Sequence, residues 1–299
     1  MTVPHAHTRT LLRRDALPFL SGFVALACQT LIFRSFFGAF ESNEIGIALF
    51  FVTWLVWAAL GALSGQRSRR LATAYDALLW LYVPAFLVQQ TLCDHLYRLA
   101  HLPAYVSFPL ARLVPIAMGV NAPLGWLTGW LFTRAAIWRA TDARTPVSRV
   151  YLLDALGSGL GGTATTIALA IGASEEQVFF AAILLLGLAV TVGAPRPRRA
   201  AFHAAATALV ALLWLGGAEA RWAALRDGAA WRRLGLAIES SHAFSTPRAR
   251  YRIGRRAGEH VVLAGQSVME TLPAEESARA LAAIHLAQHP QARRVLIIS

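Results

Sequence analysis

The sequence predicts a mostly α-helical, polytopic membrane protein: a bundle of seven or eight transmembrane helices over residues 1–217 and a small α+β soluble tail over residues 218–299. Hydrophobic residues make up 56% of the 299 residues and charged residues only 15%, whereas about a quarter of the residues in a soluble protein are charged. The mean hydropathy is +0.49, and the apolar residues form long runs before residue 218. The lipid bilayer is therefore the first expected partner.

The charged residues argue against a nucleic-acid partner. The net charge of +12 comes from arginine alone, since the chain contains no lysine, and we attribute this to a coding bias. The arginines lie in loops between apolar runs, where they act as topology signals. They do not form the stripe with interleaved aromatic residues that a nucleic-acid groove has.

The cysteines, Cys28 and Cys93, predict neither a disulfide framework nor a cysteine-based metal site. Cys93, Asp94 and His95, together with His101, form either a polar loop between spans or a weak metal cluster. Their spacing fits no defined site, so we expect no metal.

The first apolar segment begins at residue 17. It follows three arginines within residues 9–14, as in a signal peptide, and Cys28 resembles a lipoprotein cleavage site. The apolar run nevertheless continues to residue 40, which gives the ~20 residues that a spanning helix needs. We therefore expect an uncleaved first span.

Further spans are expected at residues 45–63, 75–88, 103–132, 151–171, 178–192 and 201–215. The segment 103–132 is rich in proline and glycine, so it forms one long broken helix, a re-entrant pair or two short crossings. Irregular backbone at membrane depth requires protein or a water-filled cavity to satisfy its polar groups.

Arginine clusters at 9–14, 67–70, 139–149 and 196–199 alternate with acidic loops, which predicts a cytoplasmic N-terminus. A single crossing of 103–132 gives seven spans and a tail on the outer side. Two crossings give eight spans and a cytoplasmic tail, as the arginines between 221 and 233 favour. Both topologies stay open.

Residues 157–162, GSGLGG, match the dinucleotide-binding pattern G-x-G-x-x-G. A Rossmann unit, however, needs an amphipathic helix after the glycines, and TATTIALAIGA is apolar or small on every side. Gly157 and Gly161 instead form a G-x-x-x-G pair, and Ser158 and Gly162 form a second small pair. We expect these glycines to pack against a neighbouring membrane helix.

Asp154 lies one turn before these glycines and is costly at membrane depth unless it is paired or hydrated. One interpretation is a polar site inside the bundle, with Arg34 and Arg112 as candidate partners. The other is an interfacial aspartate near the start of its helix, where acidic residues are favourable.

The tail has a different pattern. Residues 232–239, 249–254 and 260–264 predict short strands, the last two as a hairpin. Pro273 and the acidic residues after it open a helix that stops before Pro290. The apolar residues 294–298 predict the buried first strand of a parallel sheet.

The order of hairpin, Ala264-Gly265-Gln266 turn, helix and RRVLIIS strand resembles the entry into the spermidine synthase fold, in which a small β-domain precedes a Rossmann-like domain. Upstream, SGFVALACQTLIFR and the Y-x-x-D-x-x-G-x-x-x-G stretch from Tyr151 are similar to bacterial membrane-integrated spermidine-synthase-like proteins, often labelled fused transporter/spermidine synthases.

This resemblance implies a multi-pass protein of the bacterial inner membrane with an aminopropyltransferase-like, polyamine-related activity. It implies decarboxylated S-adenosylmethionine or a related nucleoside as the cofactor of the intact family, and Gln266 as a substrate contact. The nucleoside-binding loop and the catalytic acids would follow Ser299. We therefore expect a truncated chain with no catalytic residue or cofactor of its own, which works with a separate downstream catalytic chain or as a homo-oligomer.

Two other functions are compatible with the sequence. The bundle could be a transporter or export partner for a small cation such as a polyamine, because discontinuous helices often form substrate sites. It could equally be a membrane anchor that tethers or oligomerises.

Overall fold

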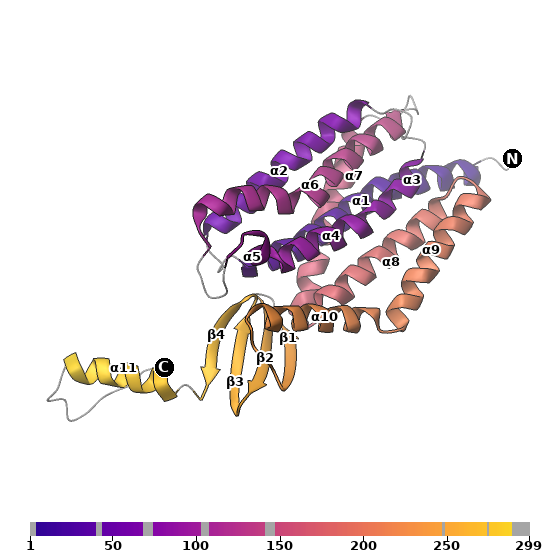
Figure 1. The fold of residues 1–299 in the computed structure, drawn as a ribbon. Coiled ribbons are helices and arrows are strands. Elements are labelled where there is room, and N and C mark those ends of the chain that lie inside the picture. The colour runs from indigo at the N-terminus through magenta and orange to yellow at the C-terminus, as the bar shows by residue number, and fades with distance from the viewer. Residues whose placement is uncertain are drawn as a thin grey trace.

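A computed structural model of the chain describes residues 4–39, 44–67, 74–102, 108–140, 147–246, 249–273 and 275–288. Long helices lie side by side in a bundle, and a four-stranded sheet hangs from one end of it (Figure 1). The helices are α1 (Pro4–Ala39), α2 (Glu44–Arg67), α3 (Tyr75–Leu78), the 3₁₀ turn η2 (Leu79–Leu81), α4 (Tyr82–Asp94), α5 (Leu96–Leu99), α6 (Leu110–Ala140), α7 (Val147–Ala170), α8 (Glu175–Gly193), α9 (Pro197–Leu215), α10 (Ala218–Arg233) and α11 (Glu275–Gln288).

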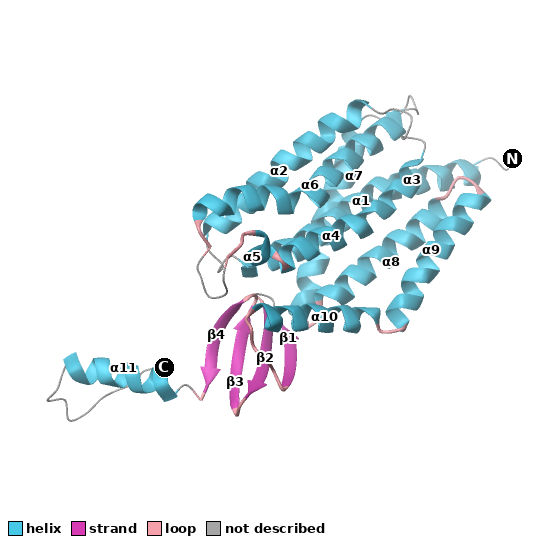
Figure 2. Ribbon diagram, viewed as in Figure 1, coloured by secondary structure: helices cyan, strands magenta, loops and turns pink. Residues whose placement is uncertain are grey.

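The predicted combination of a helical bundle and a small α+β tail is confirmed (Figure 2). Helix α1 lies near the centre of the bundle and contacts α4, α6, α7 and α8. Its buried face joins an apolar core that α4 and α8 extend, where the rings of Phe86 and Phe179 stack with their centroids 4.2 Å apart. Much of the outer bundle surface consists of exposed aliphatic side chains, as expected of a surface that faces lipid.

The predicted number of spans is wrong. Among the described residues, three helices are long and apolar enough to cross a membrane: Asp15–Ala39 within α1, α2 and α8. A fourth is added if α9 and α10, which are bent by 62° at their junction, count as one broken span. Helix α4 has only 13 residues. Helix α6 contains Asn121 and Arg134 together with glycines and prolines, and α7 contains Asp154 together with many small residues, which lowers the hydropathy of both.

The proline-rich segment 103–132 contains one helix over most of its length. Helix α6 runs from Leu110 to Ala140 with Pro115 and Pro123 inside it, so the two-crossing and re-entrant interpretations do not apply to its described part. Residues 103–107 lie outside the described residues. The break in the helical pattern occurs instead between α3 and α4, at η2.

The two ends of the bundle are distinguished by their polar contacts. At what we name the amino end, Asp15 of α1 binds Arg139 of α6 and Arg149 of α7, both at 2.5 Å. At the same end Asp76 of α3 binds Arg199 of α9. The opposite end, which we name the sheet end, carries α10 and the β-sheet (Figure 1).

The glycines of α7 lie in its contact with α1. A Cβ atom at Gly157 would lie 1.8 Å from the Phe19 carbonyl oxygen, and one at Gly161 would lie 2.2 Å from that of Phe23. A Cβ atom at Gly162 would lie 2.8 Å from the Leu26 side chain. Only a residue without a side chain allows the two backbones to come this close.

The tail forms one antiparallel sheet in the order β1 (Ser240–Ser245), β2 (Arg250–Arg256), β3 (Glu259–Ala264) and β4 (Ser267–Leu272). The predicted hairpin is confirmed as β2–β3, which pairs Arg256 with Glu259 across the turn. The strand predicted at 232–239 is wrong, because Arg232 and Arg233 end α10 and the first strand begins at Ser240. Helix α11 follows as predicted, while the strand predicted at 294–298 lies outside the described residues.

The α1–α7 contact gives a matched pair of substitutions. Gly157→Ala places a methyl group against the Phe19 carbonyl and should destabilise the protein by about 1–3 kcal/mol, as overpacking does. Gly159→Ala, where nothing lies within 4 Å of the added Cβ, should be neutral or stabilise the helix by about 0.5–1 kcal/mol. The measurement is thermal unfolding in detergent, followed by helical circular dichroism. Equal unfolding midpoints for the two variants would contradict this account of the contact.

Candidate functional site

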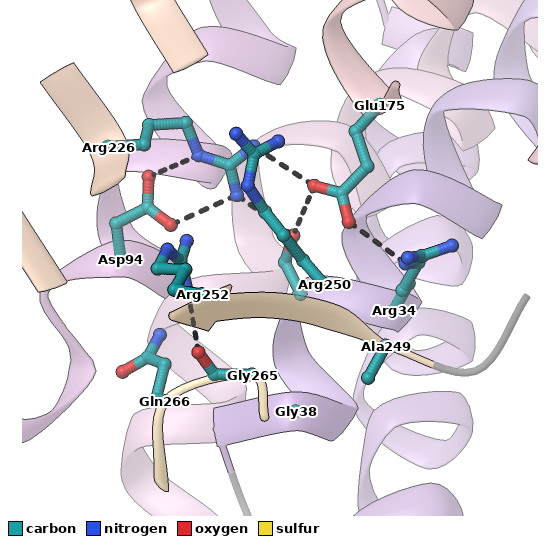
Figure 3. Close-up of a pocket in the computed structure, with 11 residues that line it drawn as sticks. Arg34, Gly38, Asp94, Glu175, Arg226, Ala249, Arg250, Arg252, Gly265 and Gln266 are labelled. Atoms are coloured by element: carbon teal, nitrogen blue, oxygen red, sulfur yellow. Dashed lines mark hydrogen bonds and ion pairs between the residues drawn. The ribbon is translucent and has the colours of Figure 1, made fainter. Parts of the chain in front are cut away.

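The most unusual part of the described structure is a cluster of buried charges where the sheet meets the bundle. We name it the junction network: Arg34, Asp94, Glu175, Glu176, Arg226, Asp227, Arg250 and Arg252. Its four carboxylates and four guanidinium groups carry equal and opposite formal charges. Figure 3 shows most of these side chains converging from α1, α4, α8, α10 and β2.

Arg226 of α10 lies at the centre of the junction network. Its Nε donates to Asp94 Oδ2 of α4 at 2.9 Å, and its NH1 donates to Glu175 Oε2 at 2.9 Å and Glu176 Oε1 at 2.8 Å. Its NH2 donates to Asp94 Oδ1 at 3.2 Å. One planar guanidinium therefore connects α4, α8 and α10, in the forked geometry that arginine provides and lysine does not.

Helix α8 presents both glutamates at its first turn. Ser174 and Gln177 form a capping box there, each side chain bonding the other's backbone N–H. The positive end of the helix dipole favours carboxylates at this position. The first turn of α8 is thus a favourable place for the two acidic side chains.

Strand β2 joins the junction network through two arginines on its inner face. Arg250 donates to both oxygens of Asp227, at 2.9 and 2.8 Å, and to Glu176 Oε2 at 3.1 Å. Arg252 donates to Asp227 Oδ1 and to the Gly265 carbonyl oxygen, both at 2.6 Å. Glu176, whose side chain is fully buried, therefore links the bundle directly to the sheet.

The two β2 arginines respond differently to burial. Burial lowers the pKa of a guanidinium, but for Arg250 the hydrogen bonds to Asp227 and the charge of Glu176 outweigh it and hold the pKa above its usual value. For Arg252 burial dominates over the attraction of Asp227, and its pKa is lowered. Arg250 is accordingly the better stabilised cation.

One interpretation of the sequence made Arg34 of α1 a partner of Asp154. In the structure Arg34 pairs with Glu175 instead. Its Nε lies 3.0 Å from Glu175 Oε1, although the angle is not that of a hydrogen bond. Its NH1 and NH2 are buried without a hydrogen-bond partner among the described residues. Arg34 also borders a cavity of about 30 Å³, which is large enough for a bridging water.

Gln266, the predicted substrate contact, lies in the turn between β3 and β4 and borders the same cavity. Its Nε2 donates to the Cys93 carbonyl oxygen at 2.9 Å, and its Oε1 accepts from Arg233 at 3.1 Å. Its backbone N–H donates to the Gly38 carbonyl oxygen at the end of α1. Both ends of its amide are thus engaged in holding the turn against the bundle.

The other predicted polar residues lie away from the junction network. Asp154 is half-buried on α7 and forms neither a hydrogen bond nor an ion pair with any described residue. Arg112 is exposed in the first turn of α6, where it donates to the Ala100 carbonyl oxygen at 2.6 Å. Within the described ranges, no three His, Cys, Asp or Glu side chains lie close enough to hold a metal ion.

Comparison with known proteins gives no identification: no family model, no curated protein and no solved structure matches the chain. The junction network must therefore be interpreted from its own geometry.

Sequence reasoning missed most of the junction network. Glu175 and Glu176 belong to the acidic loops, and Arg226 to the arginines between 221 and 233, from which the sequence analysis argued topology and not a site. The amphipathic pattern of residues 218–233, with Arg226-Asp227 at its centre, is the one local signal of an additional helix. Nothing in the sequence around Arg250 and Arg252 indicates which carboxylates they meet.

Glu176 allows a direct test of this arrangement. Glu176→Gln removes the carboxylate shared by Arg226 and Arg250 and should weaken docking of the sheet by about 3 kcal/mol, since two buried cations each lose one of their partners. Hydrogen exchange of the β2 and β3 amides measures this opening free energy.

Glu239→Gln is the matched control, because Glu239 is exposed and lies 3.9 Å from Arg255. It should change the opening free energy by less than about 0.5 kcal/mol. Equal exchange rates in the two variants would show that the junction network does not hold the sheet.

Proposed function

We propose that the chain is an integral membrane anchor of the spermidine-synthase-like type, which holds a small β-domain in a fixed position on one end of a helical bundle. The observation that carries this proposal is the chain of ion pairs from Asp94, Glu175 and Glu176 of the bundle to Arg226 of α10 and Arg250 of β2. A flexible tether would need no buried contact with the bundle. A platform that must orient its soluble part needs many contacts, directed from several helices.

We further infer that the amino end lies in the cytoplasm and the sheet end on the outer side of a bacterial inner membrane. Arg139, Arg149 and Arg199 gather at the amino end, which supports a cytoplasmic position by the positive-inside rule. Among the arginines of residues 221–233, which favour a cytoplasmic tail, Arg226 is bound by carboxylates of the bundle, whereas Arg232 is exposed and counts for the opposite orientation. Because α1 runs from one end to the other and is apolar enough to span, the two ends belong on opposite sides.

The anchoring role is separable from aminopropyl transfer. A spermidine-synthase-like domain would use decarboxylated S-adenosylmethionine or a related nucleoside, with a separate catalytic chain or a second copy of this chain as its partner. On the outer face the domain would not meet the cytoplasmic nucleoside pool. The junction network therefore supports the proposed anchoring role, and the sequence resemblance supports the proposed polyamine-related activity.

Transport of a small cation is the second candidate, and one observation favours it. The Asp154 carboxylate is half-buried and has no ion-pair partner among the described residues, so a bound cation would compensate its charge. The cavity of about 380 Å³ between α1, α7, α8 and α9 is not lined by Asp154, however, and its mainly apolar side chains offer a cation few ligands.

Cysteine labelling tests the orientation. Cys28 and Cys93 are fully buried, so the parent chain should give a low background with a membrane-impermeant maleimide. Added to intact spheroplasts, the reagent should label His242→Cys in β1 and should label Ser148→Cys in α7 only after permeabilisation. Labelling of both positions from the same side would overturn the orientation.

Proteoliposome uptake distinguishes an anchor from a transporter. The anchor proposal predicts no uptake of labelled spermidine above that of empty liposomes, with or without Asp154→Asn. If the parent chain takes up spermidine and Asp154→Asn abolishes this uptake, the anchor proposal is wrong and the transporter proposal is supported.

A further inference from the structure

A basic groove opens at the sheet end beside the junction network, with which it shares one lining side chain, Asp94. It has a volume of about 560 Å³ and lies between the α4–α5 corner and the end of α10. Arg98, Arg232 and Arg233 line it, with His95 and Tyr97. We propose that this groove binds the phosphodiester of an anionic phospholipid headgroup.

The groove is positively charged, and two of its arginines are accessible to an anionic ligand. Its one lining carboxylate, Asp94, is already bound by Arg226 through both oxygens. Arg98 and Arg232 are exposed and form no ion pair with any described residue. Two guanidinium groups that share a groove without a carboxylate of their own form a fitting site for phosphate oxygens.

The third arginine is held in place as part of the wall. Arg233 lies over the Tyr97 ring, 4.6 Å from its centroid, and donates to the side-chain and backbone oxygens of Gln266. His95 is fixed in a similar way, because its Nδ1 lies 2.9 Å from the Thr91 carbonyl oxygen and its Nε2 is left for a ligand. The groove is therefore largely preformed.

The exposed face of η2, α4 and α5, which leads to the groove, changes from apolar to polar between Val88 and Arg98. Exposed positions recur along it every three or four residues: Leu81, Pro84, Val88, Thr91 and, beyond the half-buried His95, Arg98. The apolar part from Leu81 to Thr91 extends for about 15 Å at 1.5 Å per residue. That is roughly half of the ~30 Å hydrocarbon thickness of a bilayer. A lipid whose acyl chain lies along Leu81 and Val88 would thus place its phosphate at Arg98.

The position of α10 agrees with this depth. The helix lies across the sheet end (Figure 1). Its Leu225 side chain is exposed, and its Arg226 side chain is buried. Amphipathic helices of this kind lie in the headgroup region. The guanidinium groups of a basic pocket at this level can bind the phosphate oxygens of a headgroup.

The test uses the full chain in a neutral detergent, titrated with phosphatidylglycerol or phosphatidylcholine of the same acyl chains, with bound lipids counted by native mass spectrometry. Phosphatidylglycerol should bind at least about tenfold more tightly, as expected for two arginines near an anionic lipid. Arg98→Gln combined with Arg232→Gln should abolish this preference. Arg255→Gln combined with Arg256→Gln removes the same charge from the exposed hairpin and should leave it unchanged.

Unchanged phosphatidylglycerol binding in the Arg98/Arg232 double variant would overturn the proposal. Displacement of the lipid by millimolar inorganic phosphate would also overturn it, in favour of a site for free phosphate. This inference rests on the proposed membrane insertion, but different results would contradict the insertion and the lipid site. A chain that alkaline carbonate extracts from membranes contradicts the insertion, whereas an inserted chain without lipid preference contradicts the groove alone.

Discussion

The arrangement of the sheet on the bundle depends on the burial of one cation, the guanidinium of Arg226. An arginine at this depth is tolerated only if carboxylates surround it, because removing a charge from water costs several kcal/mol. Asp94, Glu175 and Glu176 meet that requirement from two different helices. Their combined charge exceeds that of Arg226; Arg34 of α1 offsets part of the excess from within the bundle, and Arg250 of β2 offsets part of it from the sheet. The sheet is attached where the bundle lacks positive charge.

Buried ion pairs are poor sources of net stability, since apolar residues of similar volume often stabilise a protein as well or better. Their advantage is directional. An apolar contact between the sheet and the bundle would tolerate sliding and rotation, whereas Arg226 and Arg250 each satisfy their donors in one geometry. A network of this kind therefore suits a platform whose task is to orient a domain, and it explains why so many charges are buried in a chain with only 15% charged residues.

The sequence was sufficient where structure depends on local pattern. The glycine spacing at Gly157 and Gly161 describes one face of one helix, and the β2–β3 hairpin depends on a short turn. It was insufficient where tertiary neighbours decide. Residues 218–233 are too polar to predict a span, and only the carboxylates of α4 and α8 explain why their helix docks with Arg226 inward. Pro115 and Pro123 suggested a break in α6, but proline is tolerated in bundle helices when neighbouring groups satisfy the freed backbone.

The glycines and the charges are parts of one mechanism. The close approach at Gly157 and Gly161 fixes the height of α7 relative to α1, because each glycine faces a particular carbonyl of α1. Helix α7 ends at Ala170, and α8 begins at Glu175, so the α1–α7 contact also sets where the acidic turn lies. Glu175 then lies 3.0 Å from Arg34. Arg34 is about two helical turns beyond Leu26, the α1 residue that faces Gly162. A shift of one residue between α1 and α7 would move this carboxylate by about 1.5 Å, enough to lengthen its ion pairs past hydrogen-bond range. Packing within the bundle thus determines the geometry with which the sheet is held.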